Sequence, residues 1–181
     1  MRSDRLDERN KLQKDKPMTQ LQILPAKPAD VSAILELIRG LAEFERLSHI
    51  CVATESDIAT ALFGEKPVVE VVLGWRDAVP VAFALFFHNF STFLGRRGLY
   101  LEDLYVRPEW RGRGYGRELL IHLAKIAVDR GCGRFEWTVL DWNARAISFY
   151  EALGAQILPD WRITRATGAS LERLARMELA P

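Results

Sequence analysis

The apolar positions of this chain follow two patterns, helical spacing and short strand-like runs, which together predict helices alternating with strands. Apolar residues recur at helical spacing over 31–42, 117–130 and 143–153, with shorter helices expected over 54–64 and 171–177. β-branched and aromatic runs predict strands over 21–24, 68–73, 81–87, 98–106 and 135–140, and further short strands near Ile157 and over 161–164. This order of elements indicates an α/β fold with a mixed central sheet flanked by helices.

Residues that favour helix ends support these boundaries. Asp30 is the residue type expected at the N-cap of the first long helix. Residues Thr54–Asp57 form a capping-box-like sequence, and Gly64 would end that short helix. Gly131 and Gly154 follow two later helices, where a stop signal is expected. The cap residues and the apolar pattern therefore agree on the same order of elements.

Length and composition predict one globular domain with a tail. The chain has 181 residues, of which 49% are hydrophobic and 27% charged, as in ordinary globular proteins. With roughly 150 residues per domain, we expect a single domain over 18–181. Residues 1–17 are mostly charged and offer little apolar surface to bury, so we expect a disordered tail there.

The same composition argues against several classes of function. A formal charge of +1 makes a sequence-wide attraction to nucleic acid unfavourable, although a local basic site stays open. The chain contains no run of about 18 apolar residues, so we expect no membrane helix. The N-terminus also lacks the apolar region of a secretory signal, so the cytoplasm is the default location. Two cysteines and three scattered histidines do not have metal-ligand spacing, so we expect no metal.

The most informative segment is the glycine-rich stretch 111–116, Arg-Gly-Arg-Gly-Tyr-Gly, which follows a strand and precedes a helix. Its three glycines allow a tight turn and a close approach of the backbone to a ligand. The first amides of the following helix lack intrahelical partners, so they can donate hydrogen bonds to an anion. The positive end of the helix dipole also attracts an anion there. Arg111, Arg113 and Arg117 add guanidinium groups that match phosphate oxygens. This unit predicts a pyrophosphate site.

Two common nucleotide motifs do not fit this segment. A Walker loop requires Gly-Lys-Ser/Thr, which the stretch lacks. A dinucleotide fingerprint requires Gly-x-Gly-x-x-Gly near the first strand, but here Gly112, Gly114 and Gly116 are evenly spaced and come late in the chain.

The segment resembles the Gln/Arg-x-x-Gly-x-Gly/Ala motif with which the GNAT acetyltransferase superfamily binds acetyl-CoA. Residues 140–143 (Leu-Asp-Trp-Asn) and 148–155 (Ser-Phe-Tyr-Glu-Ala-Leu-Gly-Ala) resemble its second motif. Together with residues 100–106 (Tyr-Leu-Glu-Asp-Leu-Tyr-Val), they are similar to the spermidine/spermine (diamine) N-acetyltransferases and the thialysine N-acetyltransferases. The resemblance implies a GNAT fold, in which two neighbouring parallel strands splay apart.

The resemblance also implies which residues hold the cofactor acetyl-CoA. The pantetheine arm would lie between the splayed strands, paired with backbone groups, and the pyrophosphate would lie in the glycine-rich loop. The other side of the cofactor would meet the start of the next helix, where Asn143 also suits the N-cap. The cofactor-binding residues expected are Leu104, Tyr105, Val106, Arg111, Gly112, Arg113, Gly114, Tyr115, Gly116, Arg117, Asn143, Ala144, Arg145 and Ala146.

Acetyl transfer to an amine requires a base and an acid. A free alkylamine has a pKa of roughly 10.4, so a base must take its proton before it attacks. Glu102 matches the acidic position of the family and is the expected base, acting through water. Asp103 would point to the opposite face of a regular strand, where we expect a structural role. Tyr150 matches the family tyrosine that protonates the leaving thiolate.

The acceptor side follows from the same resemblance. Substrate-binding positions match Phe44, Glu45, Glu102, Glu136, Trp137 and Thr138. Carboxylates beside a cationic amine would steer it and compensate its charge. Polyamine-acetylating members commonly carry an acid in the loop where this chain has Ser91, Thr92 and Phe93, which favours a smaller amine or amino acid.

The resemblance leaves alternatives open. The first expectation is acetylation of a small primary amine, without nucleic acid or membrane as partner. A protein or peptide N-acetyltransferase and a non-catalytic CoA-binding module are the alternatives. The diamine enzymes also imply a homodimer, in which Trp142 and Trp161 would lie at the subunit contact.

Overall fold

A five-stranded mixed sheet organises the protein, as seen in a computed structural model that describes residues 21–177. The strands run in the order β1-β2-β3-β4-β5. Their bounds are β1 Gln22–Pro25, β2 Glu70–Arg76, β3 Val79–Ser91, β4 Arg96–Val106 and β5 Phe135–Trp137. Neighbouring strands are antiparallel except β4 and β5, which are parallel. The predicted mixed α/β sheet is therefore confirmed.

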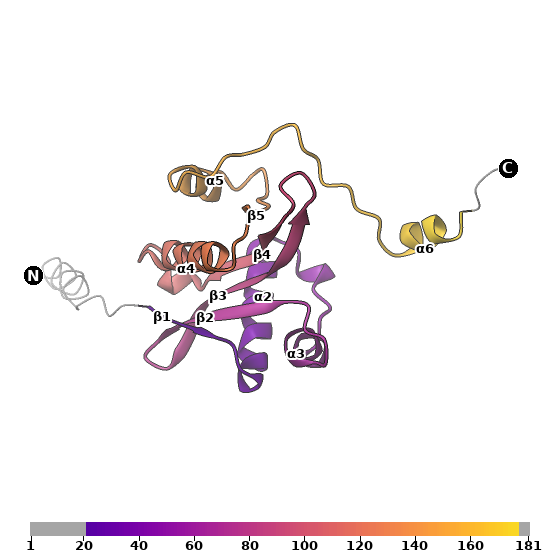
Figure 1. Cartoon of the computed structure of the whole chain (residues 1–181). Coiled ribbons are helices and arrows are strands. Elements are labelled where there is room, and N and C mark those ends of the chain that lie inside the picture. Colours follow the sequence, from indigo (N-terminus) through magenta and orange to yellow (C-terminus); the bar gives the residue numbers. More distant parts are fainter. Residues whose placement is uncertain (1–20, 178–181) are drawn as a thin grey trace, which may run out of the picture. The chain divides into compact units, whose positions relative to one another are not determined.

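Helices connect and flank these strands (Figure 1). The α-helices, labelled as in the figure, are α2 Val31–Phe44, α3 Glu55–Phe63, α4 Tyr115–Asp129, α5 Ala144–Glu151 and α6 Ala169–Ala175. Three short 3-10 helices are η1 Pro28–Asp30, η2 Ser48–Ile50 and η3 Pro108–Trp110. No helix among residues 21–177 is long and apolar enough to cross a membrane.

The described residues fall into two compact units that divide between Thr138 and Val139. The first unit holds the sheet with α2, α3 and α4, and the second holds α5 and α6. The single domain expected over 18–181 stays a prediction, and the expected tail over 1–17 lies outside the described residues.

Burial of apolar side chains fixes α2 and α3 to one face of the sheet. Ile34 and Leu37 of α2 and Leu62 of α3 pack with Leu73 and Phe83, which project from β2 and β3. Helix α4 instead contacts β3 and β4 through a separate apolar stripe that includes Leu119, Leu120, Leu123 and Ala127. Because the Phe83 side chain is 0% exposed, we expect its truncation to alanine to cost about 3–5 kcal/mol. This packing gives the sheet a rigid frame for the loops at its edge.

Cap chemistry agrees with the sequence at most helix ends. The hydroxyl of Thr54 accepts from the amide of Asp57 at 3.2 Å, and the Asp57 carboxylate accepts from the amide of Thr54 at 2.9 Å, which confirms the capping box. Gly64 caps α3, as predicted. Asp30 occupies the N-cap of α2, but its carboxylate accepts from the amide of Lys27 and closes η1 instead.

Some predicted bounds and two predicted strands were wrong. Helix α4 begins at Tyr115 rather than at residue 117. Strand β5 ends at Trp137 rather than at residue 140, level with the point where β4 bulges in its pairing with β3. Within the described part of the C-terminal region, residues 155–168 form no strand, since an apolar run without a neighbouring strand has no ladder to join.

Candidate functional site

The centre of the site is the C-terminal half of β4. Its parallel pairing with β5 ends where Leu101 meets Trp137, yet β4 continues to Val106. Within the first unit, no described strand pairs with this edge of β4 over 102–106. Unpaired backbone N–H and C=O groups need partners, so such an edge inside a sheet is suited to a ligand with amide groups. The predicted cofactor positions Leu104, Tyr105 and Val106 lie on this segment.

A β-bulge at Glu102 changes which way the following side chains point. On β3, Leu85 pairs with Asp103 and the next residue, Phe86, pairs with Leu101, so Glu102 is the extra residue. Cross-strand partners share a face of the sheet. Asp103 therefore lies on the face of Leu85, which packs with α2. The expectation that Asp103 points away from Glu102 assumed a regular strand, and the bulge removes that regularity.

Asp103 interacts electrostatically with its neighbour Glu102 and with Glu45, the C-cap residue of α2. Burial, followed by the nearby carboxylates of Glu102 and Glu45, raises the pKa of the Asp103 carboxyl from 3.8 to about 7. Burial also raises the pKa of Glu45. Burial thus favours the protonated forms of Asp103 and Glu45, and the three carboxyl groups together attract a cation. They are suited to receive a protonated amine and to take its proton.

Sequence reasoning named Glu45 and Glu102 as candidates and expected a structural role for Asp103, so it did not predict the electrostatic interaction among them. A signal was present, because acidic residues are depleted in strands and two adjacent ones stand here within an apolar run. The bulge that turns Asp103 to the face of Leu85 depends on the pairing with β3, which the sequence pattern does not reveal. Among the described residues, no group of three or more His, Cys, Asp or Glu is arranged to hold a metal ion.

The glycine-rich loop adopts the backbone that an anion site requires. Gly112 has φ +76° and Gly114 has φ +86°, and no atom lies within 4 Å of a Cβ built at either position. The backbone conformation itself, rather than crowding, therefore requires glycine. Gly114 is the N-cap of α4 and has no side chain with which to cap the first amides of the helix. These amides are therefore suited to bind an anion such as phosphate.

The arginines of the loop have different surroundings. The Arg111 guanidinium lies 4.4 Å from the Phe44 ring centroid and 5.4 Å from that of Tyr105. Its Nε donates to the Val106 carbonyl at 2.9 Å. Arg113 lies 4.9 Å from the ring centroid of Trp110, and Arg117 is exposed on the first turn of α4. All three cationic groups thus border the predicted pyrophosphate site.

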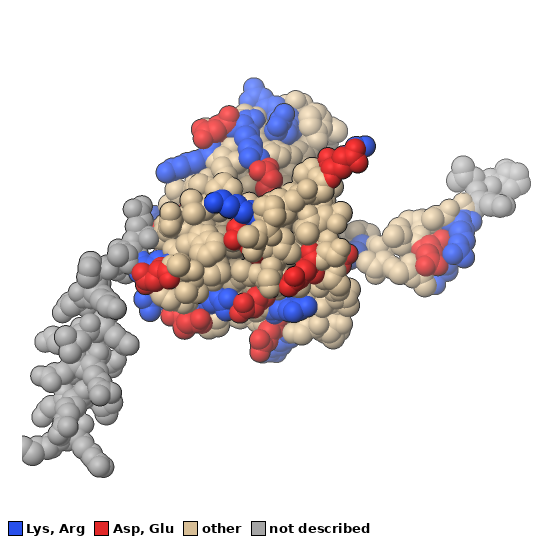
Figure 2. Space-filling model, turned by 90° about the horizontal axis from the view of Figure 1, so that it is seen from below, with Lys and Arg blue, Asp and Glu red and all other residues tan. Residues whose placement is uncertain are grey.

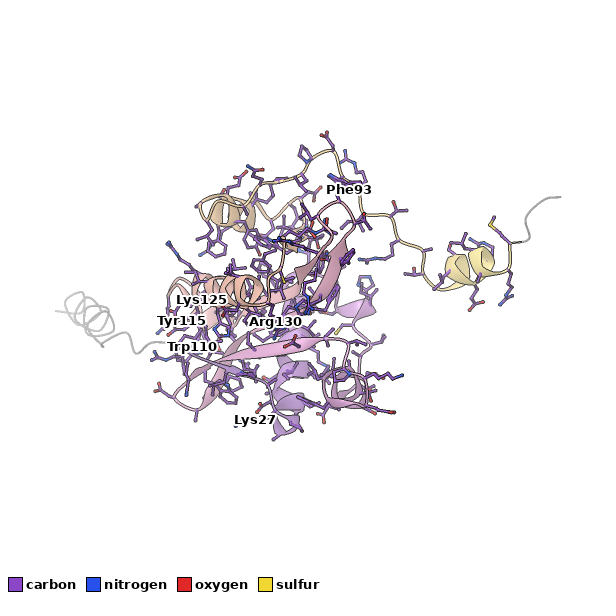
Figure 3. The ribbon with its side chains drawn as sticks, viewed as in Figure 1. Lys27, Phe93, Trp110, Tyr115, Lys125 and Arg130 are labelled. Carbon is purple, nitrogen blue, oxygen red and sulfur yellow. The ribbon has the colours of Figure 1, made fainter. Side chains whose placement is uncertain are left out.

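Trp110 and Tyr115 lie together where the loop enters α4 (Figure 3). Their ring centroids are 6.3 Å apart with an interplanar angle of 29°. Arg76, at the end of β2, lies 6.0 Å from each ring centroid. Because Tyr115 is buried, its ring fastens the start of α4 to the sheet while its backbone stays in the loop.

Three predicted acceptor residues lie near the end of β5. Glu136 faces Tyr100 in the paired part of β4. Its carboxylate lies 2.7 Å from Nε of Arg134 and accepts from the side-chain amide of Asn89 at 3.0 Å. Trp137 is the last residue of β5, and the exposed Thr138 ends the first unit. Since the charge of Glu136 is compensated by Arg134, it is less suited to a cationic amine than the carboxyl groups on β4.

The remaining predicted residues belong to the second unit. Asn143 is the N-cap of α5, where its side-chain oxygen accepts from the Ala146 amide at 3.2 Å, which confirms the predicted cap. Ala144 and Arg145 are exposed on the first turn. Tyr150 is half-buried on α5, with its ring centroid 5.3 Å from that of Phe149.

Charges of both signs are interspersed over the face of the molecule seen in Figure 2, in keeping with the formal charge of +1. The charges that distinguish the site are therefore local. They are the carboxyl groups beside β4 and the guanidinium groups of the loop.

Comparison with known proteins agrees with this geometry. The sequence model of the Acetyltransferase (GNAT) family matches residues 33–155. The thialysine N-epsilon-acetyltransferase of Bos taurus is 38% identical over 169 residues, covering 87% of this chain and 99% of that protein. The L-ornithine N5-acetyltransferase of Arabidopsis thaliana is 35% identical over 199 residues, covering 85% of this chain and 87% of that protein.

A solved structure supports the same assignment. An integron cassette protein from the mobile metagenome of V. cholerae superposes with a TM-score of 0.72 at 28% identity, covering 88% of this chain and 99% of that one. The segment 33–155 that matches the family model includes the unpaired half of β4, the glycine-rich loop and helix α5. The chain therefore belongs to the acetyltransferase (GNAT) family, and it is an acetyltransferase.

Proposed function

We propose that the protein is an N-acetyltransferase that moves an acetyl group from acetyl-CoA to a primary amine of a small molecule, by direct attack in a ternary complex. The observation that carries the proposal is on β4. This strand has an unpaired edge suited to amide groups, and the carboxyl pair Glu102–Asp103 lies where that edge begins. Donor and acceptor would thus meet on one strand.

The residues present fit acetyl-CoA. The backbone of Leu104 and Tyr105 would pair with the pantetheine amides, and the α4 amides after Gly114 would hold the pyrophosphate with Arg111 and Arg113. Asn143, Ala144, Arg145 and Ala146 would contact the cofactor from the second unit. Acetyl-CoA supplies an acetyl group already activated as a thioester. The chain supplies orientation and proton transfer.

The carboxyl cluster would receive and deprotonate the amine. A cationic amine would be attracted by Asp103 and by the two carboxylates that interact with it, Glu45 and Glu102. Glu102 would accept the amine proton through water, and Asp103 would share it, since a group with a pKa of about 7 exchanges protons readily near neutral pH. The amine nitrogen then has a lone pair with which to form the new C–N bond.

Tyr150 would provide the second proton transfer. As the C–S bond breaks, negative charge grows on sulfur, and a phenol can donate its proton there. Once the C–N bond has formed, the nitrogen loses its second proton, which reprotonates the phenolate through solvent, while the first proton taken from the amine leaves through the carboxyl cluster. The motif that contains Tyr150 lies within the matched segment, which supports this role.

The acceptor we propose is a small amine with one or more charges, such as a diamine, a short polyamine or an ω-amino acid. The printed names of the relatives include enzymes that act on thialysine and ornithine. The β3–β4 hairpin has Ser91, Thr92 and Phe93 where polyamine-acetylating members commonly have an acid. This difference favours an amino acid over a long polyamine.

Release of free thiol from acetyl-CoA tests the function. The panel is thialysine, ornithine, lysine, putrescine, spermidine and a short peptide with a free N-terminus. We expect release with at least one small amine, and faster release with thialysine or ornithine than with spermidine. Release with the peptide alone would replace the proposal with protein acetylation. Binding of acetyl-CoA without release for any amine would replace it with a non-catalytic module.

We also propose that the enzyme is a homodimer. The C-terminal segment presents large apolar side chains to solvent, among them Trp142, Trp161, Ile163 and Leu174. Exposed apolar surface on this scale is typical of a subunit contact. Light scattering at micromolar concentration should give the mass of two chains, and the mass of one chain would refute the proposal.

A further inference from the structure

Arg111 is held on three sides by described residues of the first unit. Phe44 and Tyr105 lie beside its guanidinium, at 4.4 Å and 5.4 Å from their ring centroids. Its Nε donates to the Val106 carbonyl at 2.9 Å. A guanidinium has five N–H donors, and the four on its Nη atoms form the fork that matches a phosphate. The contacts at Nε and at the ring faces therefore fix the direction of that fork.

Helix α2 provides one of the two aromatic rings. Phe44 is the last residue of α2, and its side chain is 39% exposed. The other ring is anchored to the same helix, since a Cβ added to Gly40 would come within 2.7 Å of the Tyr105 hydroxyl oxygen. The end of α2 and the end of β4 are therefore packed closely, with Arg111 lying against both.

We propose that Phe44 is a positioning residue of the donor site, which holds the Arg111 guanidinium in the orientation that binds the pyrophosphate. This inference rests on the proposed function. It differs from the sequence expectation, in which Phe44 contacts the acceptor amine. The last turn of α2 then serves both substrates, because Phe44 contacts the donor arginine while the next residue, Glu45, belongs to the carboxyl cluster.

The interaction has a measurable size. A guanidinium over an aromatic face is worth about 0.5–2 kcal/mol depending on exposure, which corresponds to about a 3- to 30-fold change in an equilibrium constant. Phe44 is partly exposed, so we expect the lower part of this range. Tyrosine keeps the aromatic face, whereas leucine and methionine keep apolar bulk without it.

The test measures donor affinity in four variants. We expect Phe44→Leu to raise the Kd of acetyl-CoA about 3- to 10-fold by calorimetry, with the KM of the amine unchanged. Phe44→Met should behave like Phe44→Leu, and Phe44→Tyr like the parent enzyme. Phe90→Leu is the matched control, because this exposed phenylalanine lies on β3 away from the loop.

Two further measurements separate positioning from a general structural effect. Acetyl-pantetheine lacks the pyrophosphate, so its KM should not change in Phe44→Leu. In an Arg111→Gln background, Phe44→Leu should add no further loss of acetyl-CoA affinity, because the group that it orients is gone.

Three results would overturn the inference. The first is an unchanged Kd for acetyl-CoA in Phe44→Leu, the second is an equal loss with acetyl-pantetheine, and the third is a loss that adds fully to that of Arg111→Gln. A raised KM for the amine alone would return Phe44 to the acceptor site. Failure of the proposed function is distinct, since the parent enzyme itself would then release no thiol.

Discussion

The buried carboxyl of Asp103 should make the free energy of unfolding depend on pH, and the substitution Asp103→Asn should remove that dependence. In the folded protein the pKa of this group is about 7, compared with an ordinary value of 3.8. Its folded-state pKa is raised, so the favourable contribution of the protonated form is complete below about pH 4 and is lost as the pH rises through about 7. Each pKa unit corresponds to about 1.4 kcal/mol, so the whole difference is worth roughly 4 kcal/mol.

Asparagine has nearly the shape of aspartic acid but does not titrate. We therefore expect the free energy of unfolding of Asp103→Asn, relative to the parent, to increase by roughly 3 kcal/mol between about pH 5 and about pH 9. The assay is urea unfolding followed by fluorescence at several pH values, with the variant and the parent in the same buffers. Asp129→Asn is the control, because this residue is exposed on α4 and should give a flat difference.

The sources of the raised pKa can be tested in the same series. Glu102→Gln removes one of the two negative charges that disfavour ionisation of Asp103, so the increase seen with Asp103→Asn should be smaller in that background. A pH-independent difference between Asp103→Asn and the parent would refute the reasoning. It would mean that water or a cation compensates this carboxylate in the folded protein.

Three other predictions follow from single residues. Tyr150→Phe should lower kcat by about 100-fold or more while leaving the Kd of acetyl-CoA nearly unchanged, and an unchanged kcat at saturating substrates would remove its role as acid. Gly114→Ala should destabilise the protein by about 1–2 kcal/mol through its φ of +86° alone, since its surroundings leave room for a methyl group; a neutral effect in thermal unfolding would contradict this. Thr54→Ala should lower the free energy of unfolding by about 1 kcal/mol through loss of the α3 cap, whereas Ser56→Ala on the same turn should have little effect.

Much of the fold could be predicted because its signals are local. The apolar spacing over 31–42 reports directly on a helix that buries one stripe, and Thr54 with Asp57 form a cap within a single turn. The glycine-rich loop was equally readable, since positive φ angles at Gly112 and Gly114 require that residue type. These features depend on neighbours in the sequence and on little else.

The rest could not be predicted because it depends on partners distant in the sequence. The strand predicted over 135–140 ends at Trp137, beside a bulge of β4 that is defined only by its pairing with β3. Ile157 and Ile163 resemble strand residues in sequence but have no neighbouring strand among the described residues. The surroundings of Asp103 and Phe44 likewise arise from contacts between α2 and β4.

The bulge at Glu102 has a consequence for how this site can change. One extra residue in β4 turns Asp103 and Tyr105 toward α2, and the pairing with β5 stops at that same point. The strand edge proposed for the donor and the carboxyl group proposed for the acceptor therefore depend on the same irregularity of the backbone. Deleting a single codon there would send both side chains to the wrong side of the sheet and realign the strand edge, so the two halves of the site would be lost together.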